Sequence, residues 1–305
     1  MNQTQISTDV TEAAQILLSG GIIGLPTETV YGLAACALNE SAVSKVFAVK
    51  GRPTSHPLIV HLSPDADLTN WGIFTPEALR LAQAFWPGPL TLLVKRTTMV
   101  PDWVTGGRDT VALRVPSHPV AIELLRTVDT GLVAPSANKF GKVSPTTAQH
   151  VLDDLGNSVD LILDGGSCEV GVESTIVECL DHSVTLLRPG LISAEQIHHV
   201  LQTQMTTEQG VSRAPGMLVS HYTPNANVVL VDSIEEAKQR QTKLELNGDK
   251  VAVIHHHQVD EYAKKLYDEL RAADHNACST VIAVLPTDEG LGAAIRDRLR
   301  KAATR

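Results

Sequence analysis

Short apolar segments alternate with amphipathic segments along the first 200 residues of the chain. Residues 9–19 place Val10, Ala13 and Leu17 on one face, which is the spacing of a helix. The same reasoning predicts helices over residues 41–49, 75–85, 119–128, 146–155 and 193–201. The apolar runs between them predict strands in GIIGL, PLIVHL, LTLLVKR, TVALRVP, GLVAPSAN and DLILDGG, and a hairpin of STIVEC with VTLLRPG.

The pattern changes after residue 201. Residues 202–227 are polar, contain Gly and Pro, and show no sustained period, which predicts a long connection. Beyond it, the apolar runs NVVLV, KVAVIHH and TVIAVLP alternate with helical stretches, which predicts a small parallel sheet covered by helices. We therefore expect a catalytic-type domain over residues 1–202, a linker over 203–227 and a small α/β domain over 228–305.

Composition narrows the class of protein. Hydrophobic residues make up 43% of the 305 residues but aromatic residues only 4%, which favours buried strands of an α/β core. The net charge of -9 argues against a surface that wraps nucleic acid. The four cysteines form no CxxC pair, and we find neither a secretory signal nor an apolar run long enough to cross a bilayer. We therefore expect a cytoplasmic protein with reduced thiols and no membrane contact.

Polar residues follow the apolar strands of the first domain, in PTETVYG, KGRP, LRVP, APSAN, ESTIV and LRPG. Ligands of α/β sheets bind at strand ends, where the loops face one crevice. One sheet would bring together the cations and small polar residues Lys50, Arg52, His61, Arg114, Arg188, Thr27, Thr29, Ser136, Asn138, Ser144 and Ser174. Such a cationic pocket predicts an anionic ligand, a phosphate or a carboxylate.

Absent motifs narrow the chemistry further. The chain has no GxxxxGK[ST] loop, no GxGxxG after a strand and no GxSxG elbow. Nothing marks one Ser or Cys as a nucleophile. A basic pocket without a nucleophile suits phosphoryl or nucleotidyl transfer, in which the protein positions the reactants and neutralises charge, and a metal often helps.

The same motifs resemble a known family. PTETVYGLA, KGRPTSHPLIVH, WPGPLTLLV, VALRVP, APSAN with GKVSPT, ESTIV and LRPG are similar to the YrdC-like threonylcarbamoyl-AMP synthases. APGMLVSHYTP and the ending GLGAAIRDRLRKAA resemble the two-domain form, and the resemblance covers nearly the whole chain. It implies an N-terminal twisted mixed sheet with helices and a strand-end cavity, plus a small C-terminal Rossmann-like parallel α/β domain.

The resemblance also implies an activity. Members of the family make L-threonylcarbamoyladenylate from L-threonine, bicarbonate or CO2, and ATP, and release pyrophosphate. The threonine amine would attack CO2 or bicarbonate, and the resulting carboxylate would attack the α-phosphate. The product serves the threonylcarbamoyl modification of adenosine 37 in tRNAs that read ANN codons. The partners implied are these substrates and the tRNA threonylcarbamoyl-transfer machinery, and a weak contact with tRNA stays open.

Roles carry over to the matching positions. The threonine contacts implied are Thr27 or Thr29, His61, Arg114, Ser136 and Ser174. The ATP contacts implied are Lys50, Arg52, His56, Thr110, Asn138, Ser144, Arg188 and Tyr222. The catalytic pair implied is Lys50 and Arg52, with no metal held by the protein itself and Mg²⁺ arriving on the ATP phosphates. His56 stands where relatives often have Asn, and Tyr222 would cover the nucleotide from the linker, where Pro215 and Gly216 suit a bend.

Other interpretations remain at this stage. Thr27 could cap a turn, and His61 could be a satisfied core histidine. The basic cavity could instead hold RNA in a translation or ribosome-assembly factor. The last helix is amphipathic, and we expect Ala294, Ile295 and Leu299 to face the core of the small domain with its Arg and Lys residues solvated. The small domain would anchor the linker or contact partners, and its sequence offers no site of its own.

Overall fold

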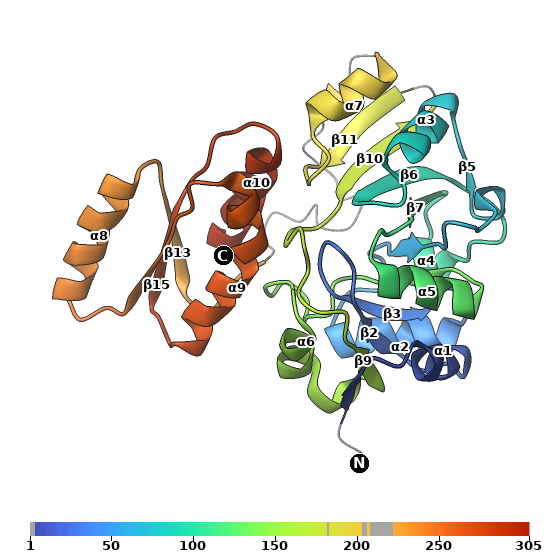
Figure 1. Cartoon of the computed structure of the whole chain (residues 1–305), viewed down its shortest axis with the longest axis horizontal. Helices are drawn as coiled ribbons and strands as arrows, with labels where there is room; N and C mark the ends of the chain where they lie inside the picture. Colours follow the sequence, from blue (N-terminus) through green and yellow to red (C-terminus); the bar gives the residue numbers. More distant parts are fainter. Residues whose placement is uncertain (1–3, 182, 203–205, 208–221, 305) are drawn as a thin grey trace.

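The computed structural model describes residues 4–181, 183–202, 206–207 and 222–304. Figure 1 shows a large N-terminal part built on one sheet and a smaller C-terminal part beside it. The chain is therefore a mixed α/β protein of two parts, as the sequence predicts. The expected linker falls mostly on residues outside the described ones, and the bend expected at Pro215 and Gly216 lies there entirely.

The large sheet is mixed and, among the described residues, has twelve strands. Their order across the sheet is β1 (Gln5–Ser7), β9 (Leu161–Leu163), β2 (Ile23–Leu25), β3 (Gly32–Cys36), β8 (Leu132–Val133), β4 (Ile59–His61), β7 (Thr110–Arg114), β6 (Leu90–Arg96), β10 (Thr175–Leu180), β11 (Ser183–Arg188) and β12 (Thr206–Thr207). The remaining strand, β5 (Gly72–Ile73), pairs with β6. The expected hairpin is present, because β10 and β11 pair antiparallel.

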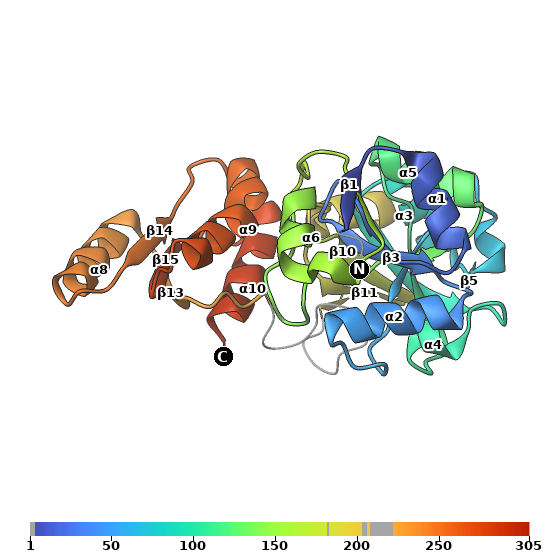
Figure 2. The same ribbon diagram turned by 90° about the horizontal axis from the view of Figure 1, so that it is seen from below.

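Helices cover both faces of this sheet (Figure 2). One face packs against α1 (Val10–Leu18) and α5 (Pro119–Val128) through a core that includes Leu17 and Leu124. The larger core on the other face includes residues of α2 (Glu40–Lys50), α3 (Pro76–Phe85), α6 (Ala148–Leu155) and α7 (Ala194–Leu201). Three short helices complete this part: η1 (Leu68–Asn70), α4 (Asp102–Thr105) and η2 (Gly156–Ser158).

Strand alternation decides which side chains reach the site. In β4 and β7, Val60 and Leu113 point into the larger core. Their neighbours His61 and Arg114 therefore point to the opposite face, and the parallel register places these two residues side by side. Ile59, which shares that face, belongs to a small separate apolar cluster. The central strands thus present polar side chains on a face where the outer strands pack against α1 and α5.

The C-terminal part is a three-stranded parallel sheet in the order β13 (Asn227–Val231), β15 (Thr280–Val284) and β14 (Val251–Ile254). Helix α8 (Ile234–Leu246) lies on the side of this sheet away from the N-terminal part. Helices α9 (Val259–His275) and α10 (Leu291–Ala303) lie on the other side and face the N-terminal part (Figures 1 and 2). The second part therefore presents two helices to the first.

Two expectations from the sequence need correction. GLVAPSAN forms a strand only at Leu132–Val133, because Pro135 has no N–H to donate, although Ser136 still bridges to Gly32. In the last helix, Ala294, Ile295 and Leu299 are buried as expected, but Arg298 is also buried rather than solvated. None of the described helices combines the length and hydrophobicity that crossing a membrane requires.

Candidate active site

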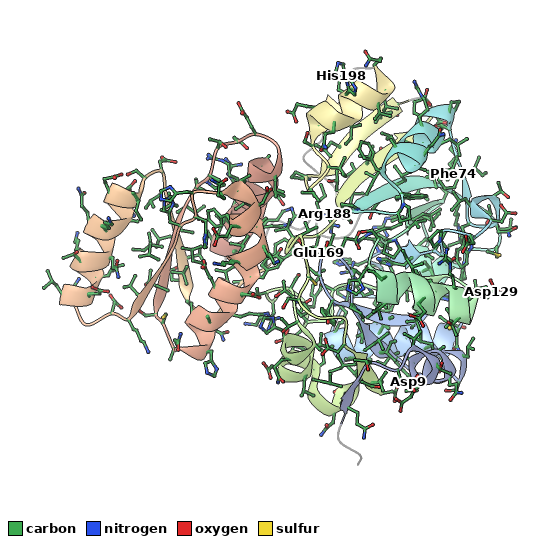
Figure 3. The ribbon with its side chains drawn as sticks, viewed as in Figure 1. Asp9, Phe74, Asp129, Glu169, Arg188 and His198 are labelled. Carbon is green, nitrogen blue, oxygen red and sulfur yellow. The ribbon has the colours of Figure 1, made fainter. Side chains whose placement is uncertain are left out.

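The ends of the central strands enclose a narrow cavity at the side of the sheet that faces the C-terminal part. Figure 3 places Arg188, at the end of β11, between the large sheet and the C-terminal helices. The space available to the centre of a water molecule is only about 50 Å³, so the walls lie close together. Among the described residues the lining is Thr29, Val30, Arg52, Ile59, His61, Arg114, Ala134, Pro135, Ser136, Glu173, Ser174, Arg188 and Tyr222.

Arg114 is fixed by three protein groups at the end of β7. Its Nη2 lies 2.7 Å from Oε1 of Glu28 in an ion pair in which both side chains are about 95% buried. Its Nη1 donates to Oγ1 of Thr29 at 2.9 Å, and its Nε donates to the carbonyl of Gly88 at 3.4 Å. A guanidinium held in this way presents a planar fork at a known position, which suits a substrate carboxylate.

His61 lies beside Arg114 and is fully enclosed. Burial, together with the charge of Arg114, lowers the pKa of His61 to about 3. The imidazole is therefore neutral at physiological pH, and its Nδ1 has no hydrogen-bond partner among the described residues. His61 thus lines the cavity as a neutral imidazole and adds no positive charge to it.

The structure separates the two threonines that the sequence could not separate. Thr29 lines the cavity and contacts Arg114. Thr27 lies behind it, where its hydroxyl donates to the carbonyl of Val30 at 2.6 Å and contacts Oγ1 of Thr29 at 2.9 Å. Thr27 therefore shapes the turn that presents Thr29, which is the turn-capping role considered for it from sequence.

Arg52 and Lys50 lie on opposite sides of a helix end. Lys50 is the last residue of α2, and Gly51, with a φ of 67°, ends the helix and redirects the chain. Arg52 then lines the cavity, donates to the carbonyl of Pro57 at 3.0 Å and has its pKa lowered to about 10 by burial. It therefore stays charged at physiological pH.

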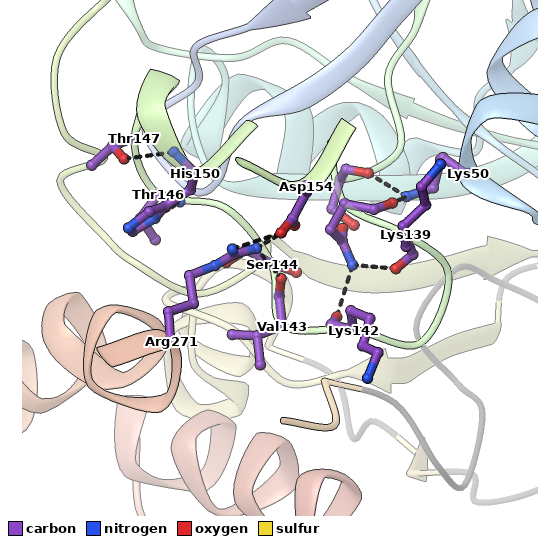
Figure 4. A network of polar contacts seen from close by, with 12 residues as sticks. Lys50, Lys139, Lys142, Val143, Ser144, Thr146, Thr147, His150, Asp154 and Arg271 are labelled. Carbon is purple, nitrogen blue, oxygen red and sulfur yellow. Dashed lines mark hydrogen bonds and ion pairs between the residues drawn. The ribbon is translucent and has the colours of Figure 1, made fainter. Parts of the chain in front are cut away.

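Lys50 is buried behind the cavity wall. Its ammonium donates to the carbonyl of Ser136 and, at 2.7 Å, to that of Asn138 (Figure 4). Burial and the neighbouring charge of Arg52 lower its pKa well below the usual value. Lys50 thus holds the loop that carries Ser136 into the cavity, and Asn138 braces the same loop by donating to the carbonyl of Lys142.

The register of the central strands separates the expected substrate contacts. His61 and Arg114 stand at the ends of the parallel strands β4 and β7. Thr110 stands at the start of β7, and the segment that precedes β4 and contains His56 lies beside it. Neither Thr110 nor His56 lines the cavity. Thr110 shares the face of Arg114, about 13 Å away at 3.3 Å per residue. The contacts expected for threonine and for the far end of the nucleotide therefore lie at opposite ends of the same two strands.

Arg188 and Ser174 form a third side of the cavity. Arg188 donates from Nε to the carbonyl of Ser174 and from Nη2 to its hydroxyl, both at 3.0 Å. The Ser174 hydroxyl also contacts Oγ1 of Thr91 at 2.8 Å. Together with Arg52 and Arg114, Arg188 makes the third buried guanidinium of the lining, so arginines outnumber carboxylates at the cavity of this acidic protein.

Two buried carboxylates of the site were not assigned from the sequence. Glu28 pairs with Arg114, and Glu173 lines the cavity beside Arg188. Glu173 also accepts a hydrogen bond from Ser144 at 2.6 Å, so Ser144 stands behind the wall. Both acids belong to the polar segments that marked the site, PTETVYG and ESTIV. A carboxylate does not bind an anion, so the expectation of an anionic ligand did not point to them.

The same two carboxylates bear on the expected Mg²⁺. Among the described residues no group of three or more His, Cys, Asp and Glu could hold an ion. Glu28 is paired with an arginine, and Glu173 accepts hydrogen bonds from three donors. The residues present therefore do not form a magnesium site of their own.

The C-terminal part contacts the site region through partly buried polar groups. Arg271 of α9 pairs with Asp154 of α6 at 2.5 Å and donates to the carbonyls of Val143 and Ser144 (Figure 4). Tyr222, which directly follows the undescribed segment, is 1% exposed and lines the cavity. Tyr222 of the linker thus contributes to the described lining, and the C-terminal part braces the region behind it.

Comparisons with known proteins cover both parts. Residues 15–190 match the Sua5, YciO and YrdC family described as telomere recombination. Residues 192–304 match the family described as the C-terminal domain of threonylcarbamoyl-AMP synthase.

Relatives resemble the chain over nearly its whole length. A threonylcarbamoyl-AMP synthase of Pyrococcus abyssi is 38% identical over 95% of this chain and 92% of its own, and one of Bacillus subtilis is 38% identical over 96% and 92%. Among solved structures, P. abyssi Sua5 complexed with L-threonine superposes with a TM-score of 0.92 at 36% identity, covering 98% of this chain and 96% of that one.

Proposed function

The chain belongs to the Sua5, YciO and YrdC family and carries the C-terminal domain of threonylcarbamoyl-AMP synthases, and from this premise we propose how its cavity works. The protein is an enzyme, a nucleotidyltransferase that forms L-threonylcarbamoyladenylate from L-threonine and ATP for tRNA modification. The relatives favour this activity over an RNA-binding factor. The burial of the three cavity arginines also argues against RNA, because a chain of phosphates needs an exposed surface.

Bicarbonate or CO2 supplies the carbon atom in the proposed reaction. The amine nitrogen of threonine forms a bond to this carbon, which gives an N-carboxylate; bicarbonate loses water in this step. An oxygen of the new carboxylate then bonds to the α-phosphorus of ATP while the bond to the bridging oxygen breaks, and pyrophosphate leaves. Two anions must approach each other in the second step, so a cationic cavity lowers its barrier.

The threonine carboxylate occupies the Arg114 end in this proposal. Arg114 offers the planar fork, and Thr29 and neutral His61 offer hydrogen bonds beside it. Neutral His61 is suited to this place because a second charge would have to be desolvated with the substrate. Ser136 and Ser174 line the same cavity and supply the further hydroxyl contacts in this proposal.

The nucleotide extends from the middle of the cavity toward the start of β7. Arg52 and Arg188 face the phosphates, while Thr110 and the segment with His56 lie at the end of strands β4 and β7 opposite to Arg114. Lys50 and Asn138 act through the loop that they hold, and Ser144 acts through Glu173.

Mg²⁺ enters as a complex with ATP in this proposal, because the described residues offer no ligand set for it. When bound to the phosphates it would reduce their negative charge. The arginines of the cavity would neutralise the remainder.

One observation carries the proposal: side chains from segments far apart in the sequence, among them Arg52, Arg114 and Arg188, meet in one buried cavity. The test is pyrophosphate release by the purified protein with ATP, Mg²⁺, bicarbonate and L-threonine, with mass spectrometry of the nucleotide product. We expect release that depends on threonine, and a product with the mass of the threonylcarbamoyl adenylate. Release that is equal with and without threonine would refute the activity.

A further inference from the structure

Helix α10 carries a buried arginine to the edge of the cavity. The Arg298 side chain is 0% exposed, although neighbouring cations of the same helix, such as Arg300, reach solvent. Its Nε donates to Oε2 of Glu173 at 2.8 Å, and its Nη1 donates to Asp297 at 2.6 Å. A guanidinium removed from water to this extent needs such partners.

Glu173 is a cavity-lining residue that both parts of the chain contact. It lines the cavity and accepts three hydrogen bonds, from Ser144 of the N-terminal part and from Tyr267 and Arg298 of the C-terminal part. The C-terminal part thus supplies two of its three donors. Glu173 also lies within electrostatic reach of Arg188, which lines the same cavity.

The ring of Tyr222 lies against the same groups. It stacks on Tyr267 with 5.7 Å between ring centroids and an interplanar angle of 25°. The guanidinium carbon of Arg298 lies 5.4 Å from its centroid, within the range of a cation–π contact. Arg298 therefore touches two residues of the cavity wall, Glu173 and Tyr222, without lining the cavity itself.

We propose that Arg298 is a positioning residue of the synthase site, which neutralises Glu173 so that Arg188 keeps its positive charge available for the nucleotide phosphates. The inference rests on the proposed function. Without Arg298, the carboxylate of Glu173 would have Arg188 as its nearest cation. Arg188 would then be shared between Glu173 and the phosphates, and ATP binding would weaken.

The threonine end should not respond in the same way. Arg114 has its own carboxylate partner in Glu28 and does not contact Glu173. Loss of Arg298 is therefore expected to raise the KM for ATP and to leave the KM for threonine unchanged. A general loosening of the fold would raise both constants.

Protonation supplies a second readout. The ionisable groups that face Glu173 are Arg188 from β11, Tyr267 from α9, Arg298 from α10 and Tyr222. Burial raises the pKa of Glu173, but Arg298, Arg188 and its hydrogen bonds lower it to about 2. Without Arg298 this pKa should rise, so ATP affinity in an Arg298→Gln variant should recover as the pH falls and Glu173 becomes neutral.

The experiment compares Arg298→Gln, Arg298→Lys, the double variant Arg298→Gln with Glu173→Gln, and the control Arg300→Gln, which removes a positive charge from the exposed side of the same helix. Pyrophosphate release gives KM for ATP and for threonine, and calorimetry gives the Kd for ATP without threonine. Thermal unfolding shows which variants are folded.

The proposal expects a KM for ATP raised about tenfold in Arg298→Gln. It expects a KM for ATP within about threefold of the parental value in Arg298→Lys, in the double variant and in Arg300→Gln. An unchanged KM for ATP in Arg298→Gln, or an equal loss in Arg298→Lys and Arg298→Gln, would overturn it. If Arg298→Gln does not fold, the folded double variant decides: parental ATP affinity supports the proposal and a tenfold loss overturns it.

The two proposals fail in different ways. A parent protein that binds ATP but releases no pyrophosphate with threonine would refute the proposed function. The Kd series for ATP would still report on Arg298 in that case, because it needs no turnover.

Discussion

Two walls of the cavity are each built on a buried arginine–glutamate pair, and the pairs are satisfied to different degrees. We define the sheet-side wall as His61 and Arg114 together with Glu28 behind them, and the domain-side wall as Glu173 together with Tyr267 and Arg298 behind it. Glu28 has its arginine and no further hydrogen-bond partner among the described residues. Glu173 has its arginine and two hydroxyl donors as well.

The two pairs are therefore expected to respond differently to a ligand. Arg114 is the single partner of Glu28 among the described residues, so it must keep this ion pair while its other N–H groups meet a substrate carboxylate. A carboxylate with three donors is held in one position, so Glu173 is not expected to move when a ligand binds. The sheet-side wall thus suits binding, and the domain-side wall suits support.

The largest effect is expected at the sheet-side wall. Arg114→Lys keeps the charge but loses the planar fork, so we expect the KM for threonine to rise about 100-fold, equivalent to nearly 3 kcal/mol. The measurement is pyrophosphate release as a function of threonine concentration. Arg126→Lys makes the same substitution in an exposed pair with Asp65 and should leave KM unchanged. A threonine KM within threefold of the parent in Arg114→Lys would mean that threonine binds elsewhere.

His61 makes the stability of the folded protein depend on pH below 6.5, where Glu173 of the domain-side wall does not yet contribute. Its folded pKa of about 3 lies below the ordinary 6.5, so the unfolded chain binds a proton between these values and the folded chain does not. Stability should therefore fall as the pH drops below 6.5, by about 2 kcal/mol on reaching pH 5.

His61→Asn should remove this contribution. We expect the free energy of unfolding, measured in urea at several pH values, to change less between pH 6.5 and 5 in the variant than in the parent. His199→Asn, on an exposed position of α7, should leave the parental slope. Equal slopes in His61→Asn and the parent would show that His61 is protonated in the folded protein. Glu173, with a pKa of about 2 against 4.5, should act only below pH 4.5.

The two walls also differ in how far the sequence predicted them. The sheet-side wall follows from local patterns: alternation in VALR places Arg114 on one face, and a similar strand places His61 beside it. The positions of most helices and strands follow from the same kind of pattern. Strand β3 was missed because its small residues are buried on both faces, which leaves no alternation to detect.

The domain-side wall could not be predicted in this way. Arg298 and Glu173 are 125 residues apart, and nothing in either local sequence indicates the other. An arginine in an amphipathic helix is normally solvated, so the basic ending of the chain predicts a surface. Only the packing of α9 and α10 against the N-terminal part buries it. Glu28 lies within PTETVYG, but its pairing with Arg114 also required the tertiary structure.

A smaller effect is expected where Arg271 joins the two parts. Arg271→Gln removes the ion pair with Asp154 and the donors to two backbone carbonyls, so we expect a loss of about 1.5 kcal/mol in the free energy of unfolding. Urea unfolding followed by fluorescence measures it. Arg240→Gln breaks an exposed pair with Glu236 on α8 and should cause no measurable change. An equal result for both variants would mean that Arg271 contributes no more than a surface arginine.

The smallest effect is expected from removing single tyrosine hydroxyls of α9. It tests whether such a hydroxyl stabilises the site or only the small domain. Tyr267→Phe and Tyr262→Phe each remove one buried hydroxyl from α9, and each should cost about 1 kcal/mol of stability. The Tyr267 hydroxyl donates to Glu173 at 2.8 Å, whereas that of Tyr262 donates to the carbonyl of Val284, inside the small domain, at the same distance. Only Tyr267→Phe should therefore change the KM for ATP, by about twofold to threefold, because Glu173 keeps its other two donors. If both variants change this KM equally, the α9 contact supports the small domain as a whole and the domain-side wall has no separate role in nucleotide binding.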